Sequence, residues 1–256
     1  MIEVKTQGEL EAMRAAGLVV ARTLRLLTDA AQVGVSTAEL NELAEQTIRD
    51  AGAVPSFKGY HGFPASICAS VNEQIVHGIP SGSQVLAAGD LLSVDCGAIL
   101  EGWHGDSAVT IEVDAASDAD RALSAATRAA MWAGVDAVVP GGRLTDISHA
   151  VQNAAEQASL ADGVEYGMIV EYGGHGIGTS MHMEPFLPNV GKPGRGPRLK
   201  IGMALAIEPM LTGGGGETRE LDDGWTVVTT DGSRSAHWEH TVAVTADGPW
   251  VLTAPE

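Results

Sequence analysis

The stretch Ser93-Val-Asp-Cys-Gly-Ala-Ile-Leu-Glu-Gly-Trp-His-Gly-Asp106 decides the fold of this chain. An apolar run from Leu91 to Val94 leads into Asp95, the turn-prone pair Glu101-Gly102 follows, and a second β-like segment extends from Asp106 to Val113. This pattern predicts a β-hairpin with one aspartate on each strand. Carboxylates in apolar strands are costly, and they repel each other unless a divalent cation lies between them. The alternative is that Asp106 caps a loop and Asp95 is half exposed.

The composition is that of a soluble globular protein that folds as one domain. The 256 residues are 45% hydrophobic, with a mean hydropathy of +0.07, and contain no apolar run long enough to cross a bilayer. The residues after Met1 predict no signal peptide. Cys68 and Cys96 are the only cysteines, too few for a disulfide framework, so we expect a reducing, cytoplasmic location.

The net charge is strongly negative. With 33 acidic and 15 basic residues, the chain has a formal net charge of −18 at pH 7. Such a surface repels phosphate backbones and anionic membranes, so we expect no direct nucleic-acid binding and no membrane association. Most of the acidic residues keep the surface soluble, but some of them are candidate ligands.

Helices are predicted in two pairs, each followed by β-like segments. Thr6 with Glu9 and Ser36 with Glu39 form capping boxes, and each box opens a helix with its apolar residues on one stripe. Residues 118–138 and about 145–160 predict the second pair, and a strand is expected at 168–172.

Several positions recur between the two halves of the chain. His77-x-x-Pro80 aligns with His182-x-x-Pro185, and Gly89-x5-Asp95 aligns with Gly202-x5-Glu208. We interpret this as an internal duplication, with halves at about 1–115 and 116–256 that pack as a single α+β domain. A shared sheet, a cleft on the pseudo-twofold axis and helices on the outer face are therefore expected.

Three more side chains lie in chemically informative settings. Glycines flank His175 in Tyr172-Gly-Gly-His-Gly-Ile-Gly178 and leave room for a ligand. Glu208 ends the apolar run 203–207, and Glu239 precedes a strand-like segment. Each alone has an ordinary explanation, either a surface histidine or a salt-bridged glutamate.

Taken together with the hairpin, these residues form a metal-ligand set. Four carboxylates and one imidazole suit Mn²⁺, Fe²⁺, Co²⁺ or Zn²⁺, and the absence of a thiolate argues against structural zinc. Four negative charges balance two divalent ions, as in two-metal hydrolytic centres. The candidate ligands are Asp95, Asp106, His175, Glu208 and Glu239.

The motifs SVDCGA, HGDSA, GGHGIG, AIEPM and EHT, in this order, closely resemble those of the type I bacterial methionine aminopeptidases. The resemblance covers nearly the whole chain. It implies the pseudo-twofold pita-bread fold, with a curved, mainly antiparallel sheet. It also implies a hydrolase that removes the N-terminal initiator methionine from nascent proteins and peptides and prefers a small second residue. A cytoplasmic monomer is the default for this family, with the ribosome as a transient partner.

The resemblance also implies a role for each candidate residue. Asp106 and Glu239 would bridge two divalent ions, Asp95 would bind one of them, and His175 and Glu208 would complete the other. A bridging water or hydroxide would attack the first peptide bond, and Glu208 would move its proton. His77 would donate a hydrogen bond to the substrate backbone and His182 to the developing oxyanion, unless each is an ordinary loop histidine.

An apolar pocket for methionine is implied as well, because a thioether offers only dispersion and weak sulfur contacts. Tyr60, Phe63, Cys68 and Trp225 match the family's pocket positions, although core packing alone is an alternative for Tyr60 and Phe63. Three positions depart from the family pattern and bear on pocket shape and turnover. Met181 stands where an aromatic ring is usual, Phe57 where a small thiol often lies, and Met183 where a glutamate often follows the histidine.

Two other functions fit parts of the pattern. Hydrolases of the same fold that cleave before proline, such as aminopeptidase P and prolidase, resemble this chain in the metal centre but usually carry a large N-terminal domain. A metal-free relative that serves as a binding module would have lost ligands, and this sequence retains all five. A dioxygen-using site with two histidines and one carboxylate does not fit a set with this many carboxylates.

Overall fold

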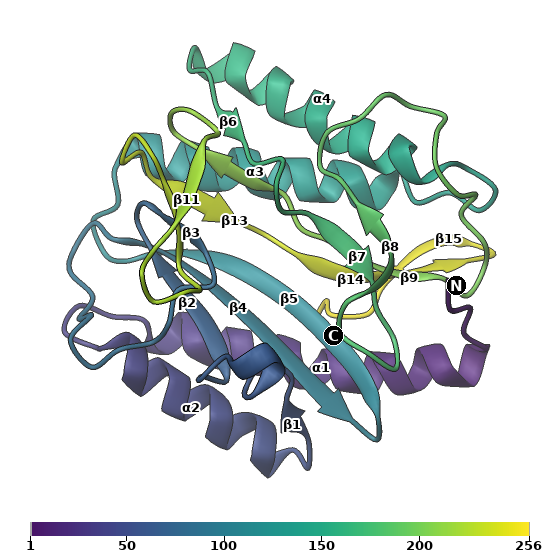
Figure 1. Cartoon of the computed structure of the whole chain (residues 1–256), viewed down its shortest axis with the longest axis horizontal. Coiled ribbons are helices and arrows are strands. Elements are labelled where there is room, and N and C mark those ends of the chain that lie inside the picture. The colour runs from purple at the N-terminus through teal and green to yellow at the C-terminus, as the bar shows by residue number, and fades with distance from the viewer. Residues whose placement is uncertain (1, 256) are drawn as a thin grey trace.

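The computed structural model describes residues 2–255, in which a pair of helices followed by antiparallel strands occurs twice along the chain (Figure 1). In the first half, two helices precede a set of strands that ends in a long hairpin. Its elements are α1 (Gln7–Ala30), α2 (Thr37–Asp50), β1 (Val54–Pro55), the 3-10 turn η1 (Tyr60–Gly62), β2 (Ile67–Val71), β3 (Gln74–Val76), β4 (Leu91–Leu100) and β5 (Trp103–Glu112).

The second half repeats this order, with two helices followed by strands. Its elements are α3 (Asp118–Asp136), α4 (Leu144–Asp162), β6 (Gly167–Met168), β7 (Gly174–Gly176), β8 (Met183–Leu187), β9 (Ala204–Ile207), β10 (Met210–Thr212), β11 (Thr218–Glu220), β12 (Val227–Thr229), β13 (Ser235–His237), β14 (His240–Thr245) and β15 (Gly248–Val251). Within the described residues, no helix is long and apolar enough to span a membrane.

The predicted hairpin is confirmed. Strands β4 and β5 pair from Leu91 opposite Glu112 to Leu100 opposite Trp103. Glu101 and Gly102 both adopt positive φ, 51° and 86°, as the tight turns of two-residue hairpins require. The second strand begins at Trp103 rather than at Asp106, because the turn closes immediately and the ladder continues from its first residue.

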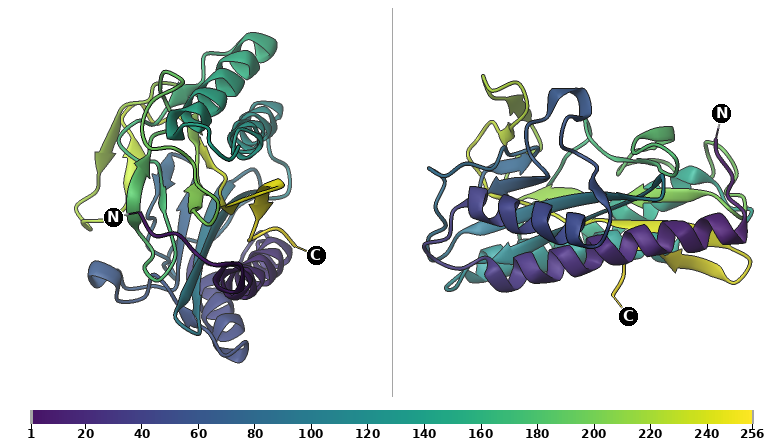
Figure 2. Two further views of the ribbon diagram at one scale, coloured as in Figure 1. Left: turned by 90° about the vertical axis from the view of Figure 1, so that its right-hand side faces the viewer. Right: turned by 90° about the horizontal axis from the view of Figure 1, so that it is seen from below.

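The helices form as their capping signals predict. The side chains of Thr6 and Ser36 accept hydrogen bonds from the backbone N–H groups of Glu9 and Glu39, and both capping boxes are complete. The two helix pairs lie on the same side of the strands, with α1 and α2 at one end and α3 and α4 at the other (Figure 2). Each pair covers its own apolar core. The first core includes Leu24, Leu40, Ile48, Ile67 and Val94, and the second includes Met131, Ile147, Val151, Leu205 and Val242.

The described strands form four separate sheets instead of one continuous sheet, and all their pairings are antiparallel. The two halves meet where β5 lies beside the start of β14. The Glu239 N–H donates to the Ala108 carbonyl at 3.0 Å, and the Ser107 hydroxyl donates to the Glu239 carbonyl at 2.6 Å. This junction brings Asp106 and Glu239 together from opposite halves.

The prediction of a strand over residues 168–172 is wrong beyond Met168, because β6 ends at that residue. Val170 and Glu171 are both exposed, so the inward and outward alternation of a strand is lost. The chain instead turns there and directs Tyr172 toward the interior cavity described below.

Candidate metal centre and substrate pocket

The five predicted ligands come from five different segments and line one cavity. Asp95 lies on β4 and Asp106 on β5, where Gly97 is opposite Asp106 and Asp95 is opposite Ala108. The two aspartates are therefore diagonal neighbours on one face of the hairpin. His175 is the central residue of β7, Glu208 follows β9 directly, and Glu239 precedes β14.

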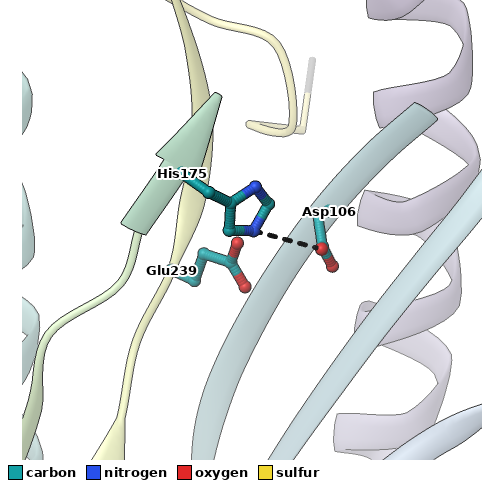
Figure 3. Close-up of side chains that lie close together, drawn as sticks. All are labelled: Asp106, His175 and Glu239. Carbon is teal, nitrogen blue, oxygen red and sulfur yellow. Dashed lines mark ion pairs between the residues drawn. The ribbon is translucent and has the colours of Figure 1, made fainter. Parts of the chain in front are cut away.

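The side chains of this set approach one another closely. His175 Nε2 lies 3.4 Å from Glu208 Oε1 and 4.0 Å from Asp106 Oδ2. One ligand atom each from Asp106, His175 and Glu239 lies within 4.8 Å of the other two. Figure 3 shows these three side chains converging on one point from β5, β7 and the start of β14. The spacing suits a cation held by all three.

Burial disfavours the ionised form of every carboxylate here, and repulsion from neighbouring carboxylates adds to it for Asp106, Glu208 and Glu239. Burial raises the pKa of Asp95 to about 7. Burial, together with the charges of neighbouring carboxylates, raises the pKa values of Asp106, Glu208 and Glu239 well above their ordinary values. No lysine or arginine lines the cavity, so no cationic side chain of the described residues neutralises them there.

Several buried polar atoms of the centre have no hydrogen-bond partner among the described residues. They are Asp95 Oδ1, Asp106 Oδ1, Glu239 Oε1 and His237 Nε2. Buried oxygens without donors are rare in folded proteins, and each needs an explanation. Anionic oxygens of this kind, next to one imidazole, fit divalent cations of the manganese-to-zinc series.

The backbone around His175 fixes which ring nitrogen faces the centre. His175 Nδ1 lies 2.9 Å from the carbonyl oxygen of Gly176, which can only accept, so Nδ1 carries the proton and Nε2 keeps its lone pair. Burial lowers the pKa of His175 to about 3, which keeps the ring neutral. Gly174 is needed beside it, because a Cβ there would lie 2.2 Å from the Ala206 carbonyl oxygen on β9.

The two histidines expected to contact substrate also reach this cavity. His77 is half-buried, and its ring meets Tyr172 and Trp225 edge to face at centroid distances of 5.6 and 6.3 Å. His182 is exposed at the cavity edge, and its ring centroid lies 4.3 Å from that of His175. His182 Nδ1 lies 3.0 Å from the Tyr60 hydroxyl. Burial lowers the pKa values of both histidines, that of His77 to about 4.

An apolar pocket adjoins the carboxylates within the same cavity, whose volume is about 200 Å³. The four predicted pocket residues line it together with two of the three residues that depart from the family pattern. The lining apolar and aromatic side chains are Tyr60, Phe63, Cys68, Trp225, Phe57 and Met181. Phe63 and Trp225 meet edge to face at 5.1 Å, which defines one wall.

Cys68 has the character of a pocket wall rather than of a nucleophile. Burial, together with the charges of Asp95 and Asp106, raises the pKa of its thiol well above the ordinary value. Met183, the third departure, does not line this cavity. It lies half buried at the start of β8 and lines an adjoining surface hollow that shares His175 and His182 with the cavity.

His237 was missed by the sequence reasoning. It is fully buried at the end of β13, lines the cavity, and places Nε2 3.8 Å from Glu208 Oε2. Burial lowers its pKa to about 3, so the ring is neutral. Its position two residues before Glu239 was the available signal in the sequence. The residue between them, Trp238, lies outside β13.

Comparisons with known proteins give a consistent result. Residues 11–246 match the sequence profile of metallopeptidase family M24. The chain is similar to methionine aminopeptidase 1 of Mycobacterium tuberculosis, at 60% identity over 253 residues that cover 99% of this chain and 95% of the relative.

Solved structures show the same fold. The crystal structure of methionine aminopeptidase from Thermotoga maritima matches with a TM-score of 0.95 at 39% identity, and the match covers 99% of this chain and 100% of that one. The prolidase of Pyrococcus furiosus matches with a TM-score of 0.77 at 21% identity over 99% of this chain and 66% of the prolidase, a likeness of fold alone. The expected pita-bread architecture is thereby confirmed.

Proposed function

Because this chain belongs to the methionine aminopeptidases of metallopeptidase family M24, we propose that it hydrolyses the first peptide bond of peptides and nascent proteins that begin with methionine. One observation carries this proposal. A buried cluster of carboxylates that could hold a cation and an apolar pocket share a single cavity of about 200 Å³. The pocket would hold the methionine side chain while its carbonyl carbon lies beside the cluster.

The proposed metal site consists of Asp95, Asp106, His175, Glu208 and Glu239, holding two divalent ions of the manganese-to-zinc series. Their unpartnered oxygens and raised pKa values support this assignment, since a cation relieves both. When bound, two such ions supply Lewis acidity, which lowers the pKa of a water molecule and polarises the scissile carbonyl. Asp106 and Glu239, which meet at the contact between β5 and the start of β14, would be central members of this ligand set.

The remaining polar residues would handle the substrate and its protons. Glu208 lies against both His175 and His237, and its carboxylate would take a proton from the attacking water and return it to the departing amine. His77 would donate to the substrate backbone from inside the pocket, and His182 to the oxyanion from its edge. Phe57, Phe63 and Trp225 belong to one apolar cluster and would exclude water from the inner pocket.

The edge of the cavity accounts for a proposed preference for a small second residue. His182 is the exposed residue among those lining the cavity, so the peptide beyond methionine must pass beside it. A bulky second side chain would displace the His182 ring or be displaced by it. Alanine, glycine or serine at this position would avoid that conflict.

The direct test is amino-acid release from Met-Ala-Ser, Met-Leu-Ser and Ala-Pro-Ala by chelated enzyme, before and after adding Mn²⁺, Co²⁺, Fe²⁺ or Zn²⁺. We expect metal-dependent release of methionine, faster from Met-Ala-Ser than from Met-Leu-Ser, and no cleavage of Ala-Pro-Ala. Release from the proline peptide alone would transfer the protein to the prolidase-like branch of the fold. No release with any metal would disprove the proposed activity.

A further inference from the structure

We propose that Tyr60 is a positioning residue that holds His182 in the tautomer with its proton on Nε2, by donating a hydrogen bond to Nδ1. This inference rests on the proposed function, because it concerns the histidine that would face the oxyanion. The observation behind it is the distance of 3.0 Å between the Tyr60 hydroxyl and His182 Nδ1.

The direction of this hydrogen bond decides what His182 can do. A neutral imidazole carries one N–H, so one ring nitrogen donates and the other accepts. If Tyr60 donates, Nδ1 accepts and Nε2 carries the proton that the oxyanion needs. If Nδ1 donates to the Tyr60 oxygen instead, Nε2 keeps a lone pair and becomes a competing metal ligand.

The surroundings of His182 favour the first arrangement. The ring lines a cavity that also contains four carboxylates, and no lysine or arginine of the described residues lines it. The carboxylate oxygens and the substrate carbonyl that this cavity would receive accept hydrogen bonds, so an N–H on this side of the ring finds partners, whereas a lone pair would need a donor there. Among the described residues, His182 has no ring partner other than the Tyr60 hydroxyl, so this contact is what selects the tautomer.

The segment around Tyr60 is built to hold its hydroxyl in place. Tyr60 lies in a tight turn in which Gly59 and Gly62 adopt φ of 88° and 92°, and His61 adopts φ of 47°. Backbone N–H groups of Gly59 and Tyr60 donate to the carbonyls of Phe63 and Phe57 at 2.8 and 2.9 Å. The ring also packs against that of His182 at a centroid distance of 5.3 Å. A turn fixed by its own hydrogen bonds leaves the hydroxyl little freedom to follow a different partner.

The test is Tyr60→Phe, which keeps the aromatic wall and removes only the hydroxyl. In the zinc-loaded enzyme, long-range ¹⁵N–¹H spectra should show His182 protonated at Nε2 in the wild type. In the variant, the same spectra should show a mixture of tautomers. We expect kcat for Met-Ala-Ser to fall by about 2- to 10-fold, the range of one neutral hydrogen bond, with KM and zinc content unchanged. The matched control is Tyr166→Phe. It removes a hydroxyl that does not line the cavity and that donates a 2.8 Å hydrogen bond to Asp162.

A double-mutant cycle separates positioning from direct substrate contact. In a His182→Ala background, Tyr60→Phe should change kcat by less than about 2-fold, because the hydroxyl then has nothing to orient. An unchanged effect in that background would overturn the proposal, as would a wild-type His182 protonated at Nδ1. The NMR spectra report the tautomer of His182 without any catalytic turnover. If the enzyme released no methionine, the proposed function would be refuted, but the spectra would still decide this inference.

Discussion

Replacing Asp95 by asparagine should stabilise the metal-free protein, although it damages the metal site. The pKa of Asp95 is raised from 3.8 to about 7 by burial, so the native state is penalised when this carboxyl is ionised. At about 1.36 kcal/mol per pKa unit, the full penalty at pH 8 is about 4 kcal/mol. Asp95 keeps part of its surface exposed, and an asparagine left without partners has its own cost. We therefore expect a net gain of about 1–3 kcal/mol.

The dependence of this gain on pH has a defined sign. A carboxyl whose pKa is raised on folding imposes no penalty below its unfolded pKa of 3.8, and the penalty grows until the pH reaches about 7. The penalty that Asp95→Asn removes should therefore be full at pH 8 and about half as large at pH 5.5, so the advantage of the variant should shrink by about 2 kcal/mol over this range. For a chain of this length, the gain at pH 8 corresponds to a rise in Tm of about 3–10 °C.

Scanning calorimetry of the chelated proteins at both pH values measures this directly. Asp231→Asn is the control of opposite sign. Hydrogen bonds from Ser233 and Gly215 lower the pKa of Asp231 to about 2, so replacing this carboxylate should lower Tm at pH 8. Adding Mn²⁺ should raise the Tm of the wild type more than that of Asp95→Asn. The reasoning is refuted if metal-free Asp95→Asn melts below the wild type at both pH values.

Three further substitutions test separate parts of the site. His182→Ala should lower kcat by about 10²–10³ with normal metal content, as expected for one lost oxyanion donor, and a loss of metal would mean that His182 is a ligand. Trp225→Ala should reduce the preference for methionine over norleucine and leucine in peptide assays, because it removes the wall against Phe63, and an unchanged preference would place Trp225 outside the pocket. Gly174→Ala should lower the free energy of unfolding by about 1–3 kcal/mol and weaken metal binding in titrations, because the added Cβ would push β7 away from β9. The control is Gly8→Ala, whose Cβ would meet nothing within 4 Å and which should leave metal binding intact.

Local sequence signals predicted much of this fold. The capping boxes at Thr6 and Ser36, the apolar stripes of the helices and the Glu101-Gly102 turn each depend on residues within a few positions of one another. The hairpin register follows from that turn, and it sets Asp95 and Asp106 on one face. Such features can be inferred from one sequence because the chain satisfies them without reference to distant segments.

The features that could not be predicted from the sequence depend on contacts between distant segments. His237 belongs to the site only because β13 pairs with β10 and directs its ring into the cavity, a consequence of tertiary pairing. The early end of β6 has the same origin, since Tyr172 must turn inward toward His77. The hydrogen bond between Tyr60 and His182 joins residues 122 positions apart in the chain, and no local pattern indicates it.

The central claim is that Asp95, Asp106, His175, Glu208 and Glu239 together hold two divalent ions. Anomalous diffraction from crystals soaked in Mn²⁺ or Zn²⁺, recorded on both sides of the metal absorption edge, locates such ions without reference to activity. We predict two peaks roughly 3.5–4 Å apart, with Asp106 and Glu239 contacting both. Peaks at other residues, or no peak among these five at saturating metal, would contradict the account.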